Sequence, residues 1–239
     1  MLKSRLCIAF FAFAVGCAPA QKPLTDYVNP MLGTATLWDS VDLGFKPTKR
    51  TWGAEVFPGS SLPNAMVQVS PVTKFHSGAG YQYEDSVIYG FTHTNKGHWN
   101  LCHIPLLPVT GTPTPGDYCS PFSHERESAA PGYYQVFLDR YGVDAQLSST
   151  LRCAFHKYTY PAGAAASLLA DLQRSNEHVR AWDIRKEGDN VFAGWQQTGE
   201  KMYFYAVANR PVTGIEPVVE GDREVRIVRF GEGDGALDL

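Results

Sequence analysis

The segment from Phe91 to His103 holds the densest group of reactive and hydrogen-bonding side chains in the sequence. Three histidines, one tryptophan and two asparagines fall within the eleven residues from His93 to His103, at the predicted end of a strand. A tryptophan can stack on the apolar face of a sugar while neighbouring amides bond its hydroxyls, and loops at strand ends commonly carry binding sites. The segment therefore predicts carbohydrate binding. The alternative is that the same side chains close the end of a β-sandwich.

Other kinds of chemistry find less support in the sequence. The spacing of five residues between His93, His98 and His103 does not bring the side chains together on a strand or a helix, so no metal site is predicted there. Acid–base hydrolysis needs paired carboxylates, and the candidates are Glu55, Glu84 with Asp85, and Glu125 with Glu127. Glu84 and Asp85 are adjacent and would point to opposite faces of a strand. Glu125 and Glu127 flank an arginine in a segment typical of a solvated turn, so all of these are interpreted as surface charges.

A site at a strand end requires a sheet to hold it, and the hydrophobic pattern has the period of two that strands produce. Residues 143–148 alternate apolar and polar side chains, and residues 190–196 place Val191, Ala193 and Trp195 on one face. No amphipathic helix longer than two turns is visible. The sequence predicts an all-β fold, an antiparallel β-sandwich over residues 25–239. Further strands are expected within residues 65–70, 87–93, 104–109, 133–138, 153–160, 167–172, 179–185, 202–208 and 224–230.

Composition agrees with a folded domain and excludes several classes of protein. The 239 residues are 44% hydrophobic and 19% charged, which is typical of a globular protein and not of a disordered or coiled-coil one. The net charge of −3 gives no electrostatic basis for binding a phosphate backbone. No nucleic-acid partner is therefore predicted. The long segment 32–57 is rich in Gly, Pro and Trp, and a loop of that length is usually functional.

Residues 1–20 have the organisation of a secretory signal peptide. Lys3 and Arg5 precede an apolar stretch from Leu6 to Val15 that is too short to span a bilayer, and small residues follow it. We therefore expect an exported protein, in the periplasm or at the outer membrane or cell surface of a bacterium.

Two processing routes remain open for this signal. The run Ala14-Val15-Gly16-Cys17 resembles a bacterial lipobox, although the usual leucine three positions before the cysteine is absent. Cleavage there would leave Cys17 as a lipidated N-terminus, and that lipid would be the only membrane contact. Alternatively, Ala18-Pro19-Ala20 fits cleavage before Gln21.

The mature domain would then contain three cysteines, Cys102, Cys119 and Cys153. Their spacings match no zinc-ligand pattern, and an odd number leaves at least one thiol unpaired. One disulfide is compatible with an oxidising compartment. The main interpretation is that the three act as small buried hydrophobic residues.

Seven segments, in order, resemble the N-terminal domain of glycoside hydrolase family 92, the calcium-dependent exo-acting α-mannosidases. The resemblance extends from residue 27 to about residue 172. The segments are 27–34 (YVNPMLGT), 57–71 (FPGSSLPNAMVQVSP), 80–83 (GYQY), 90–94 (GFTHT), 104–111 (IPLLPVTG), 122–125 (FSHE) and 131–134 (PGYY). One departure concerns a Gly-Cys and Asp-x-Gly-Asp run of many members, where this chain has Asn100 and His103 in place of both aspartates.

The resemblance implies an N-terminal β-sandwich that works with a larger C-terminal helical barrel domain. In such an inverting mannosidase the barrel carries the catalytic acid and base and most calcium ligands, so no catalytic residue is expected in this chain. Trp99 corresponds to a position where members of the family bring a tryptophan to the sugar, and His93 and Asn100 are expected to bond sugar hydroxyls. Mannose-containing glycans and the chain's own helical barrel domain are the expected partners.

Two functional hypotheses follow from the sequence. In the first, the chain is the non-catalytic domain of an exported α-mannosidase and supplies one wall of its pocket. In the second, it is a freestanding carbohydrate-binding lipoprotein of the cell surface. Residues 236–239 begin a new apolar–polar alternation at the end of the chain, which favours the first hypothesis and a domain that continues past Leu239.

Overall fold

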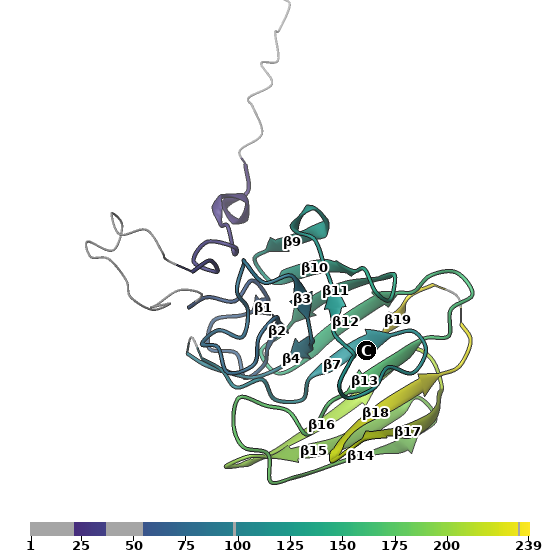
Figure 1. Cartoon of the computed structure of the whole chain (residues 1–239). Helices are drawn as coiled ribbons and strands as arrows, with labels where there is room; N and C mark the ends of the chain where they lie inside the picture. The colour runs from purple at the N-terminus through teal and green to yellow at the C-terminus, as the bar shows by residue number, and fades with distance from the viewer. Residues whose placement is uncertain (1–21, 37–54, 98, 234) are drawn as a thin grey trace, which may run out of the picture.

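The computed structural model describes residues 22–36, 55–97, 99–233 and 235–239, and these residues form an all-β protein (Figure 1). Every strand pairing is antiparallel, as predicted, and the described helical segments are two 3-10 turns, η1 (Leu24–Tyr27) and η2 (His124–Arg126). No helix in these ranges is long and apolar enough to cross a bilayer. The predicted signal peptide, Cys17 and residues 37–54 of the predicted functional loop lie outside the described residues.

The described residues form three antiparallel sheets and two short ribbons. The largest sheet has seven strands, in the order β1 (Ser60–Ser61), β2 (Gln68–Val72), β4 (Gly90–Thr92), β7 (Leu106–Val109), β13 (Ser167–Ala170), β18 (Arg223–Phe230) and β17 (Val212–Glu220). The second sheet has five strands, in the order β19 (Leu237–Asp238), β12 (Ala154–Thr159), β11 (Val143–Ser149), β10 (Tyr133–Leu138) and β9 (Glu127–Ala130). The third sheet contains β14 (Ala181–Gly188), β15 (Val191–Gln197) and β16 (Lys201–Val207). The ribbons are β3 (Val87–Ile88) with β8 (Ser120–Pro121), and β5 (Asn95–Lys96) with β6 (Trp99–Asn100).

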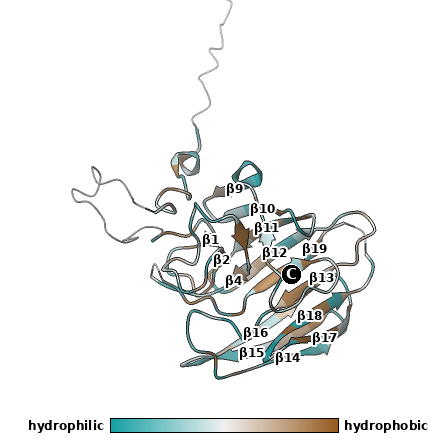
Figure 2. Cartoon of the chain, in the orientation of Figure 1, coloured by the Kyte–Doolittle hydropathy of each residue, from teal (hydrophilic) through white to brown (hydrophobic). Residues whose placement is uncertain are grey.

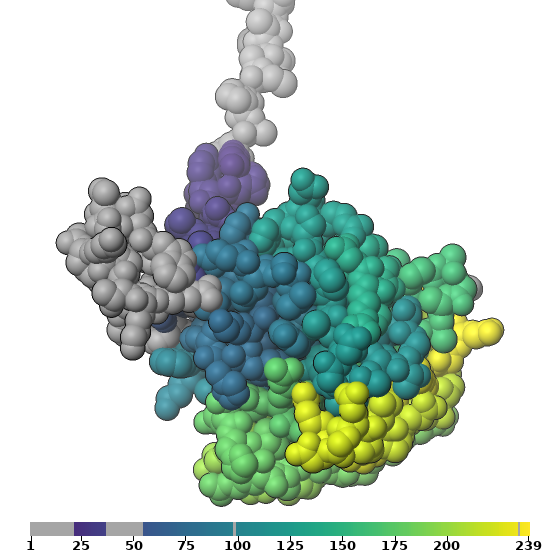
Figure 3. Space-filling view, in the orientation of Figure 1, coloured from purple at the N-terminus to yellow at the C-terminus, as the bar shows by residue number. Residues whose placement is uncertain are grey.

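The seven-stranded sheet contacts both of the other large sheets. Phe91 of β4 stacks on Tyr158 of the five-stranded sheet, with ring centroids 6.2 Å apart, and Phe230 of β18 meets Phe192 of the three-stranded sheet at 6.3 Å. Every residue of β7 and β13 is buried, as expected for strands that are covered on both faces. Figure 2 shows apolar stretches running through the strands in the middle of the molecule. In Figure 3 the C-terminal strands, in yellow, adjoin teal and green segments from much earlier in the sequence.

Alternation of apolar and polar residues, together with runs rich in β-forming residues, located most of the strands. The predicted strand 133–138 coincides with β10, where Tyr134, Val136 and Leu138 are buried and their neighbours are half-buried. The nine-residue strand β17 was not predicted, because Pro217 and a bulge between Val212 and Gly214 interrupt its pattern. β17 lies at the edge of its sheet, where a missing N–H is tolerated.

The interpretation of Glu127 as a surface charge in a turn was wrong. Glu127 begins strand β9, and its side chain is only 1% exposed. Tyr134 Oη donates to its Oε1 at 2.6 Å, Tyr81 Oη lies 2.9 and 3.0 Å from its two oxygens, and His124 Nδ1 lies 2.5 Å from its Oε2. Glu127 therefore satisfies the hydroxyls of two large buried tyrosines.

The cysteines differ more than predicted. None of the three in the described part of the chain forms a disulfide. Cys102 is buried, as expected, whereas Cys119 is half-buried and Cys153 is exposed, so the interpretation as a buried hydrophobic residue holds for Cys102 and was wrong for Cys153.

A hydrogen-bonded series of neutral side chains crosses the interior between β4 and β12. His93 Nδ1 lies 3.0 Å from the carbonyl oxygen of Ile104 and must donate to it, which leaves His93 Nε2 to accept from His156 Nε2 at 3.0 Å. His156 Nδ1 then accepts from the hydroxyl of Tyr158 at 2.7 Å. Burial lowers the pKa of His93 to about 4 and lowers that of His156 well below its ordinary value, so both rings are neutral at pH 7.

These two histidines make stability depend on pH. Because the folded pKa of each imidazole is below the value of about 6.5 in the unfolded chain, the unfolded chain binds more protons between about pH 6.5 and pH 4. The free energy of unfolding is expected to fall as the pH is lowered through this window. Denaturant unfolding at several pH values should give a shallower slope for His156→Gln than for the wild type. Parallel curves would contradict this assignment.

The buried carboxylate of Glu127 should matter far more than its neighbour in sequence. Glu127→Gln removes a charged acceptor from two buried tyrosine hydroxyls, and we expect a loss of about 2–4 kcal/mol in the free energy of unfolding. Glu125 is exposed, so Glu125→Gln is a matched control that should change stability by about 0.5 kcal/mol or less. Urea unfolding of the two variants measures both values, and equal stabilities would disprove the role of Glu127.

Candidate functional site

Trp99 lies at a groove where several strands end. The groove has a volume of about 580 Å³, and its lining includes Lys96, Trp99, His76, Asn176 and Glu177. We call it the Trp99 groove. Trp99 is 55% exposed, which is unusual for an indole and leaves much of its surface accessible from the groove.

The ribbon β5–β6 presents Trp99 at this position. Lys96 and Trp99 are cross-strand partners, so their side chains project on the same face. Gly97 has φ 61°, a left-handed conformation that glycine adopts readily in a tight hairpin turn. The local sequence thus places a cation and an indole next to each other at the groove.

Asn100, a predicted substrate-binding residue, also belongs to the lining of the groove, but it is only 1% exposed. Its Oδ1 accepts the backbone N–H of Cys102 at 2.8 Å, and its amide contacts the hydroxyl of Thr92 at 3.1 and 3.2 Å. A Cβ at Gly80 would lie only 2.6 Å from Asn100 Nδ2, so glycine is required for this close approach. Through these contacts, Asn100 stabilises the backbone that turns after β6.

His93, the other predicted hydrogen-bond partner of the sugar, faces the interior. Both of its ring nitrogens are used, one by Ile104 and the other by His156. Of the three residues predicted to bind substrate, the structure therefore brings only Trp99 to the groove as an exposed side chain. Direct contact of all three with a sugar remains a prediction from the sequence.

The segment between β6 and β7 has an uncommon backbone conformation. Cys102 and Ile104 both have φ 54°, and the left-handed region is especially unfavourable for a β-branched residue such as isoleucine. Asn100 holds the N–H of Cys102, and Gln196 Oε1 accepts the N–H of Ile104 at 2.8 Å. Side-chain amides therefore hold this backbone in place.

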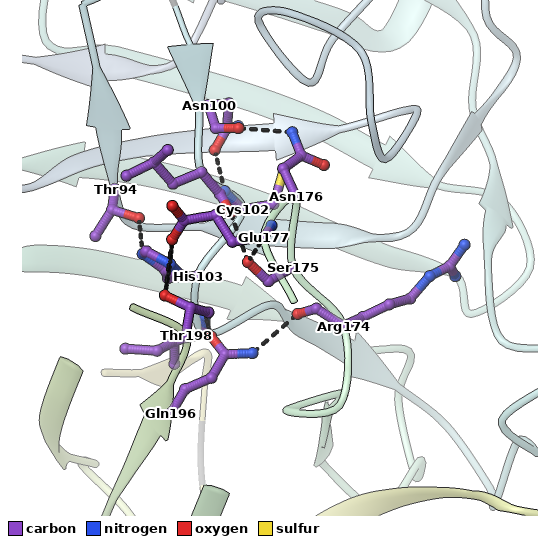
Figure 4. Close-up of polar contacts among 12 residues, drawn as sticks. Thr94, Asn100, Cys102, His103, Arg174, Ser175, Asn176, Glu177, Gln196 and Thr198 are labelled. Carbon is purple, nitrogen blue, oxygen red and sulfur yellow. Dashed lines mark hydrogen bonds and ion pairs between the residues drawn. The ribbon is translucent and has the colours of Figure 1, made fainter. Parts of the chain in front are cut away.

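Gln196 also holds the loop after β13. Its Nε2 donates to the carbonyl oxygens of Leu172 at 3.0 Å and Arg174 at 2.9 Å, and the side chain is fully buried. Figure 4 shows Gln196 reaching this loop from β15. One glutamine thus fixes the loop that carries Glu177 relative to the segment that carries His103.

Glu177 and His103 meet at the edge of the groove (Figure 4). Glu177 Oε2 accepts from Thr198 Oγ1 at 2.7 Å and from His103 Nε2 at 3.1 Å, and His103 Nδ1 lies 2.8 Å from Thr94 Oγ1. Burial lowers the pKa of His103, so the neutral ring donates through Nε2 and accepts the Thr94 hydroxyl at Nδ1. The hydrogen bond from Thr198, followed by that from His103, lowers the pKa of Glu177 and keeps it ionised.

Glu177 was missed because no motif in the sequence connects it to the segment 93–103. It lies 74 residues after His103, and only tertiary structure brings the two together. The available signal was the polar run 173–178 directly after the buried strand 167–172, at a strand end like that of Trp99.

Two other carboxylates that the sequence offers for acid–base chemistry, Glu84 and Asp85, have structural contacts. Glu84 accepts the backbone N–H of Thr36 at 2.6 Å, and Asp85 accepts the hydroxyl of Thr73 at 2.8 Å. Calcium prefers six to eight oxygen ligands, and the described residues contain no group of three or more His, Cys, Asp or Glu side chains that could hold a metal ion. The described residues are therefore not assigned as calcium ligands.

Comparison with known proteins identifies the family. The model of the glycosyl hydrolase family 92 N-terminal domain matches residues 27–232. The fold is similar to a family GH92 alpha-mannosidase from Bacteroides thetaiotaomicron, with a TM-score of 0.76 and 24% identity over 92% of this chain and 33% of that one. The complex of that mannosidase with mannoimidazole gives a TM-score of 0.74 and 25% identity over 91% and 32% of the two chains.

A GH92 inverting mannosidase from the same bacterium gives a TM-score of 0.71 and 21% identity over 91% of this chain and 31% of that one. No curated protein sequence matches significantly. The chain spans about a third of the length of these solved structures. With the family model matched over most of its length, the chain belongs to glycosyl hydrolase family 92, of which it represents the N-terminal domain.

Proposed function

We propose that this chain forms one wall of the substrate pocket of an exported, inverting α-mannosidase that removes terminal mannose from glycans. The Trp99 groove carries the proposal, because it combines an exposed indole with charged hydrogen-bonding groups at the ends of several strands. A pyranose offers an apolar face to such an indole and hydroxyls to the neighbouring polar groups. Family membership supports hydrolysis of a glycoside, and the structure of one relative is a complex with mannoimidazole.

Other parts of the proposal concern the rest of the protein. A C-terminal helical barrel domain would supply the acid, the base and the calcium that the resemblance implies. The signal sequence and Cys17 support export, with a lipid anchor if the lipobox is used. This chain's own contribution is to stack the sugar and bond its hydroxyls.

Trp99→Ala in the full-length protein tests the proposed site. Loss of an aromatic face against a sugar is expected to cost about 1–2 kcal/mol, which lowers kcat/KM for an α-mannoside about tenfold or somewhat more. The melting temperature should change little, because Trp99 is largely exposed. Tyr203→Ala is a matched control, since Tyr203 is 71% exposed on β16 and does not line the Trp99 groove.

A purely structural role for Trp99 gives the opposite pattern. The melting temperature would then fall by several degrees, and the kcat/KM of the folded enzyme would stay unchanged. His93→Gln and Asn100→Ala should lower the melting temperature, because both residues are buried in hydrogen-bonded networks. A smaller loss of kcat/KM in the folded variants would support the contacts with sugar hydroxyls that the sequence predicts.

This chain expressed alone is expected to hydrolyse no glycoside. Inverting hydrolysis requires an acid and a base about 6.5–9.5 Å apart, and the resemblance assigns both to the helical barrel. Release of mannose by the isolated chain, above that of a heat-inactivated sample, would contradict the assignment of the acid and the base to the helical barrel domain. Glycan binding by the isolated chain would be compatible with either hypothesis, whereas a native gene that ends at Leu239 would favour a freestanding binding protein.

A further inference from the structure

We propose that Glu177 is the hydroxyl-accepting carboxylate of the Trp99 groove and selects ligands that carry a sugar hydroxyl within its reach. The inference rests on the proposed carbohydrate-binding role of the groove and adds the residue that gives it selectivity. Glu177 lies in the lining of the groove with Trp99, and its side chain is 45% exposed.

The hydrogen bonds of Glu177 use only one of its two oxygens. Thr198 and His103 both bond Oε2, and Oε1 has no hydrogen-bond partner among the described residues. In Figure 4 the second carboxylate oxygen has no dashed line to any residue drawn. An ionised carboxylate only accepts hydrogen bonds, so Oε1 requires a donor from solvent or from a ligand.

The surrounding structure fixes the direction of this oxygen before a ligand arrives. Thr94 orients the ring of His103, and Gln196 fixes both the backbone next to His103 and the start of the loop that carries Glu177. A carboxylate that is already oriented loses less conformational entropy on binding than a freely rotating surface glutamate.

The charges around the groove favour a neutral ligand with many hydroxyls. The ammonium group of Lys96 acts on Glu177 electrostatically and helps to lower its pKa, so a cation and an anion are both present at the groove. A ligand with a single strong charge would be attracted by one group and repelled by the other. A pyranose can donate to Glu177, accept from Lys96 and stack on Trp99.

The test measures binding to the full-length protein by calorimetry. The probes are methyl 1-thio-α-mannoside, which resists hydrolysis, and its 2-, 3-, 4- and 6-deoxy analogues. Glu177→Gln keeps the size of the side chain but removes its charge, and it is expected to weaken binding of the parent mannoside about tenfold or more. At least one deoxy analogue, which lacks the partner hydroxyl, should bind the variant and the wild type equally.

Glu200→Gln is the matched control, because Glu200 is an exposed glutamate that does not line the groove. It should leave every affinity unchanged. Trp99→Ala should weaken all five ligands by a similar factor, since stacking does not depend on one hydroxyl.

Each failure has its own signature. If Trp99→Ala weakens binding and Glu177→Gln does not, the role of Glu177 is overturned and the proposed groove stands. If Glu177→Gln weakens binding of all five ligands equally, Glu177 supports the structure of the groove but does not bond one particular hydroxyl. The proposal is then also overturned. If neither variant changes binding, or if the wild type binds no mannoside, the groove is not the sugar site and both proposals fail.

Discussion

A single buried amide, that of Gln196, connects the parts of the molecule that form the groove. It is fully buried, and it bonds the N–H of Ile104 and the carbonyl oxygens of Leu172 and Arg174. These backbone groups lie where the chain enters β7 and leaves β13, between layers that exclude water, and leaving them unpaired would be costly. A side chain from β15 therefore satisfies the backbone of two other strands and fixes the distance between the segments that carry His103 and Glu177.

Two other groups of buried polar residues in this protein also bond one another. The hydrogen-bonded series Tyr158, His156 and His93 ends on the carbonyl oxygen of Ile104. Each imidazole N–H therefore has an acceptor, and each unprotonated ring nitrogen has a donor. The carboxylate of Glu127 is hydrogen-bonded to two tyrosine hydroxyls and one imidazole. Such networks constrain the packing because removing one member leaves the others unsatisfied in a medium of low dielectric constant. They also explain why polar residues that look like ligands in the sequence can be part of the interior.

Strands in which buried side chains alternate with more exposed ones could be predicted from the sequence. Strand β10 shows this alternation and was predicted with its observed bounds. Glu127 was misread because its neighbours suggested a solvated turn, whereas its environment is set by tyrosines 46 residues before it and 7 residues after it. Trp99 was singled out from the sequence because of its residue type and its place near a strand end, and the structure shows it as an exposed side chain of β6 at the groove. Glu177 was not found, because its role depends on contacts with His103 and Thr198 that only the folded chain creates.

Strand β17 has a consequence for the behaviour of the protein at high concentration. It pairs only with β18 in the described sheet, and a free strand edge nine residues long can recruit strands from other molecules. Pro217 removes one donor from the strand, and the bulge before Gly214 bends it. Glu220 places negative charge near its end, and Glu216 pairs with Arg229 of β18. These features oppose edge-to-edge polymerisation even though Val219 is 64% exposed on this strand. Pro217 and Gly214 interrupt the alternation by which a strand is predicted from sequence. The same two residues therefore protect the protein from aggregating through this edge.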